Sequence, residues 1–422
     1  MTYRTVILKR GKEESLRRFH PWIFSGAVAR VDEGVGEGDV VRVLTAGGDY
    51  IATGHYHVGT ITVRVLSFTD EETDSAYWRR RLGAAIDVRR RLGIAGGARG
   101  DAYRLVHGEG DSLPGLVIDI YGRTAVMQAH TVGMHWSRTD IARALMDVMG
   151  GAPDATSAPY PQPPQSPQDV TAAPGGSTPL TGVFYKSEST VPRVSADDYE
   201  GGFIVGTGGG DVITENGLRF RVDWRRGQKT GFFLDQRDNR TLLERYAAGR
   251  RVLNMFCYTG SFSAYAMRGG AAVVHSVDSS EKAVAAARAN VEMNFPGDSR
   301  HTAYADDAFA FLDAVGEGDY DLIVLDPPAF AKHRSALHNA LKGYIRLNTK
   351  ALRKIRAGGI IFTFSCSQAV TKDNFRNSVF TAAAIAGRRV RVVHQLHQPA
   401  DHPVNIYHPE GEYLKGLVLY VE

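Results

Sequence analysis

The sequence contains little cysteine and no long apolar run. Only Cys257 and Cys366 occur among the 422 residues. Two cysteines are too few for a four-cysteine zinc site or a disulfide framework, and we expect no bound metal. No segment approaches the roughly 18 apolar residues that cross a membrane, and Met1-Thr-Tyr-Arg-Thr is not followed by the apolar core of a signal peptide. We therefore expect a cytoplasmic protein of two or three domains.

A strong net charge is also absent, since 50 Lys and Arg residues stand against 46 Asp and Glu residues. Arginine is nevertheless concentrated in two triplets, 79–81 and 89–91, within a segment whose pattern predicts a helix. At about 100° per residue the triplets lie roughly 80° apart and form one broad basic face. Such a face suits nucleic-acid phosphates. A solvated helix face made of good helix formers is an equally good interpretation.

The hydrophobic pattern changes along the chain. Short β-like runs separated by glycine turns fill roughly the first 70 residues and favour a small β-barrel. The arginine helix and a hairpin-like stretch follow. Residues 151–182 are rich in Pro, Ala, Ser and Gly and are interpreted as a linker or insertion without secondary structure. From Asn216 onward strands alternate with helices. We therefore expect domains at 1–73, 74–215 and 216–422, the last an α/β, doubly wound, mostly parallel sheet.

The residues that end the strands of this last domain are the candidate site residues, because ligands of such sheets bind outside the carboxyl ends of the strands. The predicted strands are 251–256, 273–278, 320–326, 358–365 and 416–422.

The loop after the first of these strands, Asn254-Met-Phe-Cys-Tyr-Thr-Gly260, lacks the G-x-G-x-x-G fingerprint. Only Gly260 remains of the three glycines that let a backbone approach a pyrophosphate. This favours a ligand without phosphates, and S-adenosylmethionine has none. An ordinary helix-start turn is the alternative interpretation of Gly260.

Acidic residues follow three further strands. Asp278 stands where a carboxylate accepts hydrogens from both ribose hydroxyls, although it could instead cap the next helix. Asp307 is our candidate for the adenine amine, with Asp306 as the structural alternative. Asp326 opens the turn 326–330, Asp-Pro-Pro-Ala-Phe, whose two prolines make it stiff and poor in donors. We expect this turn to direct the carboxylate into the site.

Cys366 ends the fifth strand within Thr-Phe-Ser-Cys-Ser, 363–367. The fourth and fifth strands are neighbours in sheets of this kind, so Cys366 and Asp326 are expected to face one crevice. C5 of cytosine is too weak a nucleophile to attack a methyl sulfonium, but a thiolate that adds to C6 makes C5 reactive. Asp326 is expected to hydrogen-bond N3 and the amine edge of the base. Nitrogen or oxygen methylation needs no such thiol, and Cys257 is interpreted as packing.

Motifs from all parts of the chain resemble those of one known family. They are HPWIFSG (20–26), the residues around Arg104-Leu105 and Gly108-Glu109, KTGFFLDQR (229–237), TFSCS (363–367), ADHPV (400–404) and PEGEYLKG (409–416). With them the chain resembles the bacterial large-subunit rRNA cytosine-C5 methyltransferases of the PUA-domain type over nearly its whole length.

The resemblance implies a PUA domain, a central α+β domain and a Rossmann-like class I methyltransferase domain of seven strands. It also implies S-adenosylmethionine as cofactor and 23S rRNA as substrate. The candidates for cofactor binding are Gln236, Arg237, Phe256, Tyr258, Thr259, Gly260, Asp278, Ser279, Asp306, Asp307, Asp326, Pro327 and Pro328. The candidates for RNA binding are Lys9, Arg10, Trp22, Arg79, Arg80, Arg89, Arg90 and Lys229.

Two features depart from the family pattern. The insertion at 151–182 is not part of it, and Cys257 stands where a serine would be unremarkable. Other RNA cytosine-C5 methyltransferases carry a second cysteine directly after the Pro-Pro turn, where this chain has Ala329. The base that removes the C5 proton is therefore not identified by the sequence.

Two other functions remain as alternatives. An rRNA methyltransferase that acts on guanine N7 or an exocyclic amine has the same fold but no use for Cys366. A non-catalytic RNA-binding assembly factor would not need to bind S-adenosylmethionine. DNA cytosine methylation is disfavoured because its nucleophile follows a Pro-Cys turn. Whether the chain is a monomer or a homodimer is left open by the sequence.

Overall fold

The computed structural model describes residues 3–96, 100–150, 179–191, 201–331 and 333–422. The expected insertion at 151–182 lies mostly outside the described residues, and its last residue, Gly182, begins a strand. The chain divides into two compact units. Unit 1 comprises residues 1–216, 222–232 and 400–411, and unit 2 comprises residues 217–221, 233–399 and 412–422. The expected boundary at 216 therefore does not separate the whole chain in two, because two later segments pack with unit 1.

Unit 1 begins with a six-stranded sheet in the order β2-β6-β5-β4-β1-β3. Alternating side chains of its strands are buried, so that Val6, Leu8, Val41 and Val43 form part of one core. Its elements are β1 (Arg4–Leu8), α1 (Glu14–Arg17), β2 (Trp22–Phe24), β3 (Val28–Val31), β4 (Val40–Leu44), β5 (Tyr50–Tyr56) and β6 (Ile61–Ser67).

A second sheet of unit 1 has five strands in the order β11-β10-β9-β8-β7 and packs against α2 and α4. Asp74 caps α2 by accepting a hydrogen bond from the Tyr77 backbone N–H at 2.9 Å. The elements are α2 (Ser75–Arg91), β7 (Ala102–His107), β8 (Leu116–Tyr121), β9 (Thr124–Ala129), α3 (Val132–Trp136), α4 (Arg138–Gly150), β10 (Gly182–Tyr185), β11 (Gly202–Gly206) and β12 (Val212–Glu215).

Unit 2 contains a seven-stranded sheet in the order β16-β15-β14-β17-β18-β20-β19. All pairs up to β18 are parallel, whereas β20 runs antiparallel to both β18 and β19. This confirms the predicted doubly wound, mostly parallel sheet of seven strands. The strands are β14 (Arg251–Met255), β15 (Val273–Asp278), β16 (His301–Ala305), β17 (Tyr320–Leu325), β18 (Ile355–Ser365), β19 (Val390–Leu396) and β20 (Lys415–Val421), preceded by β13 (Leu218–Arg221).

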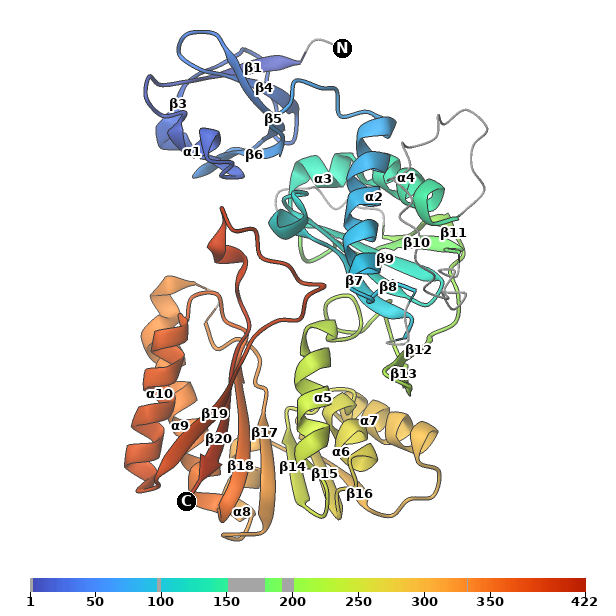
Figure 1. Cartoon of the computed structure of the whole chain (residues 1–422), viewed down its shortest axis with the longest axis vertical. Coiled ribbons are helices and arrows are strands. Elements are labelled where there is room, and N and C mark those ends of the chain that lie inside the picture. The colour runs from blue at the N-terminus through green and yellow to red at the C-terminus, as the bar shows by residue number, and fades with distance from the viewer. Residues whose placement is uncertain (1–2, 97–99, 151–178, 192–200, 332) are drawn as a thin grey trace, which may run out of the picture. The chain divides into compact units, whose positions relative to one another are not determined.

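Both faces of this sheet are buried, which explains its continuous apolar runs. Val252, Leu322 and Phe362 pack with α5, α6 and α7, whereas the alternating residues Leu253 and Ile323 pack with α8, α9 and α10. The two groups of helices are seen on either side of the sheet in Figure 1. The helices are α5 (Arg237–Tyr246), α6 (Ser261–Arg268), α7 (Glu281–Asn294), α8 (Ala308–Ala314), α9 (Leu337–Lys354) and α10 (Lys372–Ala386).

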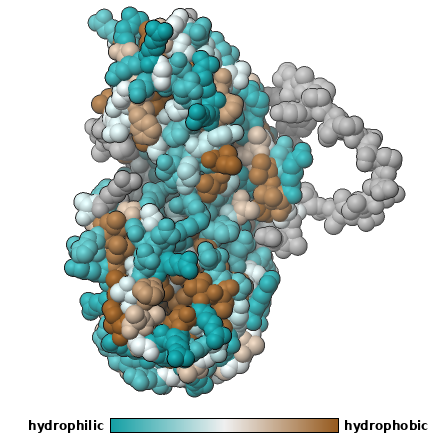
Figure 2. Space-filling view, turned by 60° about the vertical axis from the view of Figure 1, so that its left-hand side comes forward, coloured by the Kyte–Doolittle hydropathy of each residue, from teal (hydrophilic) through white to brown (hydrophobic). Residues whose placement is uncertain are grey.

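On the face shown in Figure 2, hydrophobic residues gather in several patches among hydrophilic ones. The large exposed side chains include Phe380 and Ile385 of α10 and Ile406. None of the helices in the described residues has the length and hydropathy that a membrane crossing requires.

Candidate active site in unit 2

Four strands of unit 2 end at one edge of the sheet. Parallel pairing places Met255 opposite both Val277 and Leu325, and Leu325 opposite Thr363. The loops after β14, β15, β17 and β18 therefore share that edge, as expected for a doubly wound sheet.

The loop after β14 has an unusual backbone. Phe256 and Tyr258 have φ angles of 58° and 46°, which residues other than glycine rarely adopt. Gly260 has a φ of 75°, and a Cβ atom there would meet the Cα atom of Ala287 at 2.9 Å. Close packing of this loop on α7 thus requires glycine at position 260. The requirement for glycine comes from this contact and not only from the start of a helix.

Asp278 holds this loop in place. Its Oδ2 accepts a hydrogen bond from the Tyr258 backbone N–H at 3.0 Å, and its Oδ1 accepts one from the Ser280 backbone N–H at 3.0 Å. A carboxylate accepts about four hydrogen bonds, so both oxygens keep capacity for the hydroxyls of a ribose. The cap of α7 is Ser280, whose Oγ accepts from the Ala283 backbone N–H, while Ser279 is exposed.

The preferred role of Asp307 is not supported by the structure. Its Oδ1 accepts hydrogen bonds from the backbone N–H groups of Phe309 and Ala310, both at 2.9 Å, and it is the N-cap of α8. Asp306 precedes the helix and is exposed, and its Oδ1 accepts a hydrogen bond from the backbone N–H of Asp307 at 2.7 Å. The N-cap is therefore Asp307 and not Asp306, and Asp306 becomes the candidate for the adenine amine.

Asp326 follows β17 and lies beside two polar residues from the segment before α5. Its Oδ2 accepts a hydrogen bond from Gln236 Nε2 at 3.0 Å. Burial, followed by the negative charge of Asp235, raises the pKa of Asp326 to about 7. The carboxyl group can thus carry a proton near neutral pH, which suits an acid that donates to a ring nitrogen.

Cys366 is held between two anchored serines. Ser365 Oγ donates to the Tyr344 hydroxyl at 2.9 Å, and Ser367 Oγ donates to the carbonyl of Ala331 at 2.5 Å. The Cys366 thiol is only partly buried and points toward the turn after β17, where it lies 3.9 Å from the carbonyl oxygen of Pro327. Cys366 and the Asp326 turn therefore lie next to each other. Cys257 is buried, and burial raises the pKa of its thiol, which fits the predicted packing role.

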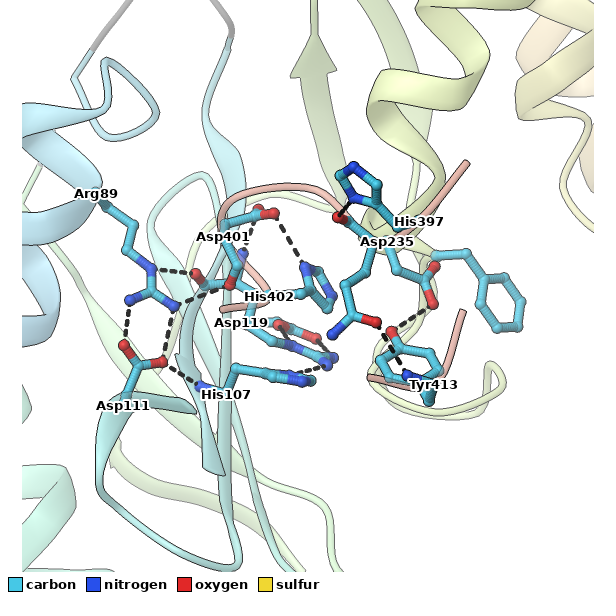
Figure 3. Close-up of polar contacts among 12 residues, drawn as sticks. Arg89, His107, Asp111, Asp119, Asp235, His397, Asp401, His402 and Tyr413 are labelled. Carbon is cyan, nitrogen blue, oxygen red and sulfur yellow. Dashed lines mark hydrogen bonds and ion pairs between the residues drawn. The ribbon is translucent and has the colours of Figure 1, made fainter. Parts of the chain in front are cut away.

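The remaining cofactor candidates lie around the same edge. Gln236 and Arg237 are buried at the start of α5, and Asp235 of the same segment accepts from the Tyr413 hydroxyl at 2.7 Å (Figure 3). Pro327 is buried and Pro328 exposed. Thr259 is 7% exposed, and its buried Oγ1 has no hydrogen-bond partner among the residues that the structure describes. A buried hydroxyl without a partner is costly, so it fits a site completed by a polar cofactor.

The RNA-binding prediction is wrong for Arg89. Its side chain is completely buried and forms a two-pronged ion pair with Asp111. The helix α2 therefore does not present both arginine triplets on one basic face. Arg79, Arg80 and Arg90 are exposed but pair with Asp147, Glu71 and Asp87, respectively.

The other RNA candidates differ in their surroundings. Trp22 is half-buried, and its Nε1 donates to Glu109 at 2.9 Å while the guanidinium of Arg64 lies 5.7 Å from its ring. Lys9, Arg10 and Lys229 are exposed. These exposed residues remain candidates.

The buried arginine belongs to a network that anchors residues 400–411 within unit 1 (Figure 3). Arg89 also donates to the carbonyl of Asp401 at 2.9 Å, and the Asp401 carboxylate accepts the Arg104 backbone N–H at 3.1 Å. Arg104 pairs with Asp119 at 2.7 and 2.8 Å. The motifs around Arg104 and at 400–404 are thus joined by structural contacts.

Sequence reasoning missed Lys415, which is buried and donates a hydrogen bond from Nζ to the carbonyl of Ser367 at 2.6 Å. The signal available was its position within the motif at 409–416, but nothing in the pattern placed it beside Cys366.

The geometry agrees with the comparisons to known proteins. Residues 192–411 match the family described as S-adenosylmethionine-dependent methyltransferase, and residues 6–68 match the PUA-like domain. The chain belongs to the S-adenosylmethionine-dependent methyltransferase family. It is 37% identical to the ribosomal RNA large subunit methyltransferase I of Klebsiella pneumoniae strain 342, over 99% of this chain and 98% of that protein. The protein of the same name from Escherichia coli O157:H7 is 36% identical, with 99% of both chains covered.

Solved structures show the same fold over the full length. A candidate methyltransferase from Streptococcus mutans superposes with a TM-score of 0.77 at 22% identity, with 100% of both chains covered. A structure of SMU.776 complexed with SAH gives a TM-score of 0.78 at 22% identity with the same coverage. The family membership and the predicted fold class are therefore confirmed, and the chain is an S-adenosylmethionine-dependent methyltransferase.

Proposed function

We propose that this chain methylates C5 of a cytosine in large-subunit ribosomal RNA, with Cys366 as the nucleophile. The observation that carries the proposal is the pairing of a partly exposed cysteine at the end of β18 with the Asp326 turn at the end of β17. The relatives in Klebsiella and Escherichia are named for methylation of large-subunit rRNA, which supports the substrate class.

In the proposed mechanism, the Cys366 thiolate adds to C6 of the cytosine, and the electron pair of the C5–C6 double bond becomes available at C5. The protonated carboxyl group of Asp326 donates to N3, which makes the ring more electrophilic. S-adenosylmethionine supplies an electrophilic methyl group when it is bound. After C5 has taken the methyl group, a general base that the sequence does not identify takes the C5 proton. The electron pair of the C5–H bond then forms the C5–C6 double bond again, the thiolate leaves C6, and the proton shared with N3 returns to Asp326.

The cofactor is proposed to lie against the loops after β14, β15 and β16. Asp278 accepts from the ribose hydroxyls, and Asp306 accepts from the adenine amine. Thr259 supplies a hydroxyl that has no hydrogen-bond partner within the described part of the chain. The strained loop at Phe256 and Tyr258 allows the backbone to approach the cofactor closely.

RNA contacts are proposed for Lys9, Arg10, Arg79, Arg80, Arg90 and Lys229, which are exposed, and for the half-buried Trp22. The proposed substrate places the enzyme in the cytoplasm. Light scattering of the purified protein distinguishes a monomer from a homodimer, between which the sequence does not decide.

The experiment that tests this function is nucleoside mass spectrometry of undermodified 23S rRNA after incubation with labelled S-adenosylmethionine. We expect label in 5-methylcytidine with the wild type and with Cys257→Ser, and none with Cys366→Ala. Label in a methylguanosine, or full activity of Cys366→Ala, would contradict the proposal. Absence of S-adenosylmethionine binding would favour a non-catalytic role.

A further inference from the structure

Lys415 lies directly against the strand that carries the proposed nucleophile. It is the first residue of β20, and antiparallel pairing places it opposite Ser365, the last residue of β18. Its Nζ donates to the carbonyl of Ser367 at 2.6 Å. The side chain therefore runs from a position beside Ser365 to one beside Ser367, the two neighbours of Cys366 in the chain. The charges of Lys415 and Cys366 interact.

Among the described residues, no carboxylate forms a direct ion pair with Lys415. The side chain is buried, and burial lowers the pKa of Lys415 to about 8. Glu412, a carboxylate near it, pairs instead with Lys372 at 2.5 Å. An unpaired buried ammonium costs stability, and a negative group that appears during the reaction would offset that cost.

Three other ionisable residues lie on the elements around the thiol in the described part of the chain. Burial raises the pKa of the Tyr344 hydroxyl on α9 to about 12, so this group stays neutral. Asp326 is neutral or negative, according to its pKa of about 7. On the side of α10, the charge of Lys372 is balanced by Glu412.

We propose that Lys415 is a positioning residue for Cys366, whose ammonium group stabilises the thiolate both when it adds to C6 and when it leaves. This inference rests on the proposed covalent function. The sulfur–C6 bond forms with the electron pair of the thiolate and breaks with its return. The proton on Nζ stays in place throughout, because Lys415 supplies charge and not a proton.

The test measures how fast iodoacetamide alkylates Cys366 between pH 5.5 and 10, with peptide mass spectrometry to separate Cys366 from Cys257. Lys415→Gln keeps a donor for the Ser367 carbonyl but removes the charge, and Lys415→Arg keeps the charge. We expect the midpoint of the profile to rise by about one pH unit in Lys415→Gln, with roughly tenfold slower alkylation at pH 7. Lys415→Arg and the exposed-lysine control Lys342→Met should keep the wild-type midpoint within a few tenths of a unit.

The methylation assay supplies a second readout. Relative to the wild type at the same pH, kcat of Lys415→Gln should be about tenfold lower at pH 7 and should approach the wild-type value toward pH 9, while the KM for S-adenosylmethionine stays unchanged. A purely structural role of Lys415 would not produce recovery at high pH.

An unchanged midpoint in a folded Lys415→Gln protein would overturn the inference. The wild type alone gives an independent check that does not depend on any variant folding. Its Cys366 midpoint should lie below the value of about 8.5 for a free thiol, and a midpoint at or above that value would also overturn the inference. Because alkylation needs no RNA, it separates this inference from the proposed function. Persistent methylation by Cys366→Ala would contradict the function and leave the effect of Lys415 on the thiol standing.

Discussion

Two groups of buried ionisable side chains in this molecule differ in whether their partners are charged or neutral. In unit 1, Arg89 donates two hydrogen bonds to the carboxylate of Asp111, and Arg104 donates two to the carboxylate of Asp119. In unit 2, Asp326 accepts from the neutral amide of Gln236, and Lys415 donates to a neutral carbonyl. The first group is internally neutralised, whereas the second leaves a carboxyl group and an ammonium group near the Cys366 thiol without direct countercharges.

The difference indicates which cluster is structural and which is functional. Two-pronged pairs satisfy both partners and hold their elements in one geometry, which is what the anchoring of residues 400–411 requires. Shifted pKa values near neutrality, as for Asp326 and Lys415, are typical of groups that exchange protons or meet a charge during a reaction. Substitutions in the two clusters should therefore change stability in opposite directions.

The largest effect on stability is expected for Arg89→Met. The substitution leaves Asp111, whose side chain is 5% exposed, buried without its partner. We expect unfolding to become easier by about 3–5 kcal/mol, as is usual when one member of a buried pair is removed. Urea denaturation measures this change.

The matched control is Arg90→Met, one position along α2. Arg90 is 49% exposed and lies 3.8 Å from Asp87, so its removal should cost less than about 1 kcal/mol. Equal effects of the two substitutions would contradict the structural role assigned to the Arg89 network.

Asp326→Asn should lower activity and raise stability. Loss of the acid is expected to reduce kcat by about 100-fold or more. A carboxyl group with a pKa raised in the folded state weakens folding as the pH rises from the unfolded value of 3.8 to about 7. The substitution removes this penalty. Because the residue is partly exposed, we expect a gain of about 1–2 kcal/mol, below the roughly 4 kcal/mol that the full shift represents.

The pH dependence gives the sharper result. The stability advantage of Asp326→Asn should be absent near pH 4, grow up to about pH 7 and then level off. Thermal unfolding across this range measures it, and Asp373→Asn in the exposed first turn of α10 serves as control. An advantage that shrinks with rising pH would show that Asp326 is stabilised as a carboxylate.

The smallest effects separate Asp306 from Asp307. Asp307→Ala removes the N-cap of α8 and should cost about 1 kcal/mol of stability. Asp306→Ala should leave stability nearly unchanged and weaken S-adenosylmethionine binding by roughly tenfold, the loss of about one hydrogen bond. Calorimetric titration and thermal melting together measure both. If Asp307→Ala weakened binding more than Asp306→Ala, the assignment of the adenine contact to Asp306 would be wrong.

Much of the methyltransferase fold followed from the sequence because its strands have buried faces and strong apolar runs. The strands at 273–278, 320–326 and 358–365 were predicted within a few residues. β19 was missed because it lies at the edge of the sheet, and its sequence, VRVVHQL, is largely exposed.

The site was predictable only where a residue's place in the chain determines its place in space. Asp278, Asp326 and Cys366 end strands, and strand ends of a parallel sheet meet at one edge. Arg89 and Asp307 were misjudged because the decisive contacts, to Asp111 and to the first turn of α8, depend on side-chain geometry. The antiparallel pairing of β20 with β18 places Lys415 opposite Ser365, the residue before Cys366, and residue spacing does not reveal this pairing.

The central claim is that Cys366 forms a covalent bond to the substrate base, and trapping that bond tests it most directly. A 23S rRNA fragment that contains 5-fluorocytidine cannot lose a proton from C5, so the adduct should persist in the presence of S-adenosylmethionine. We predict a denaturation-resistant complex with the wild type and with Cys257→Ser, its cross-linked peptide containing Cys366, and none with Cys366→Ala. Efficient methylation of unsubstituted RNA without any trapped complex, or a complex linked through Cys257, would contradict the account.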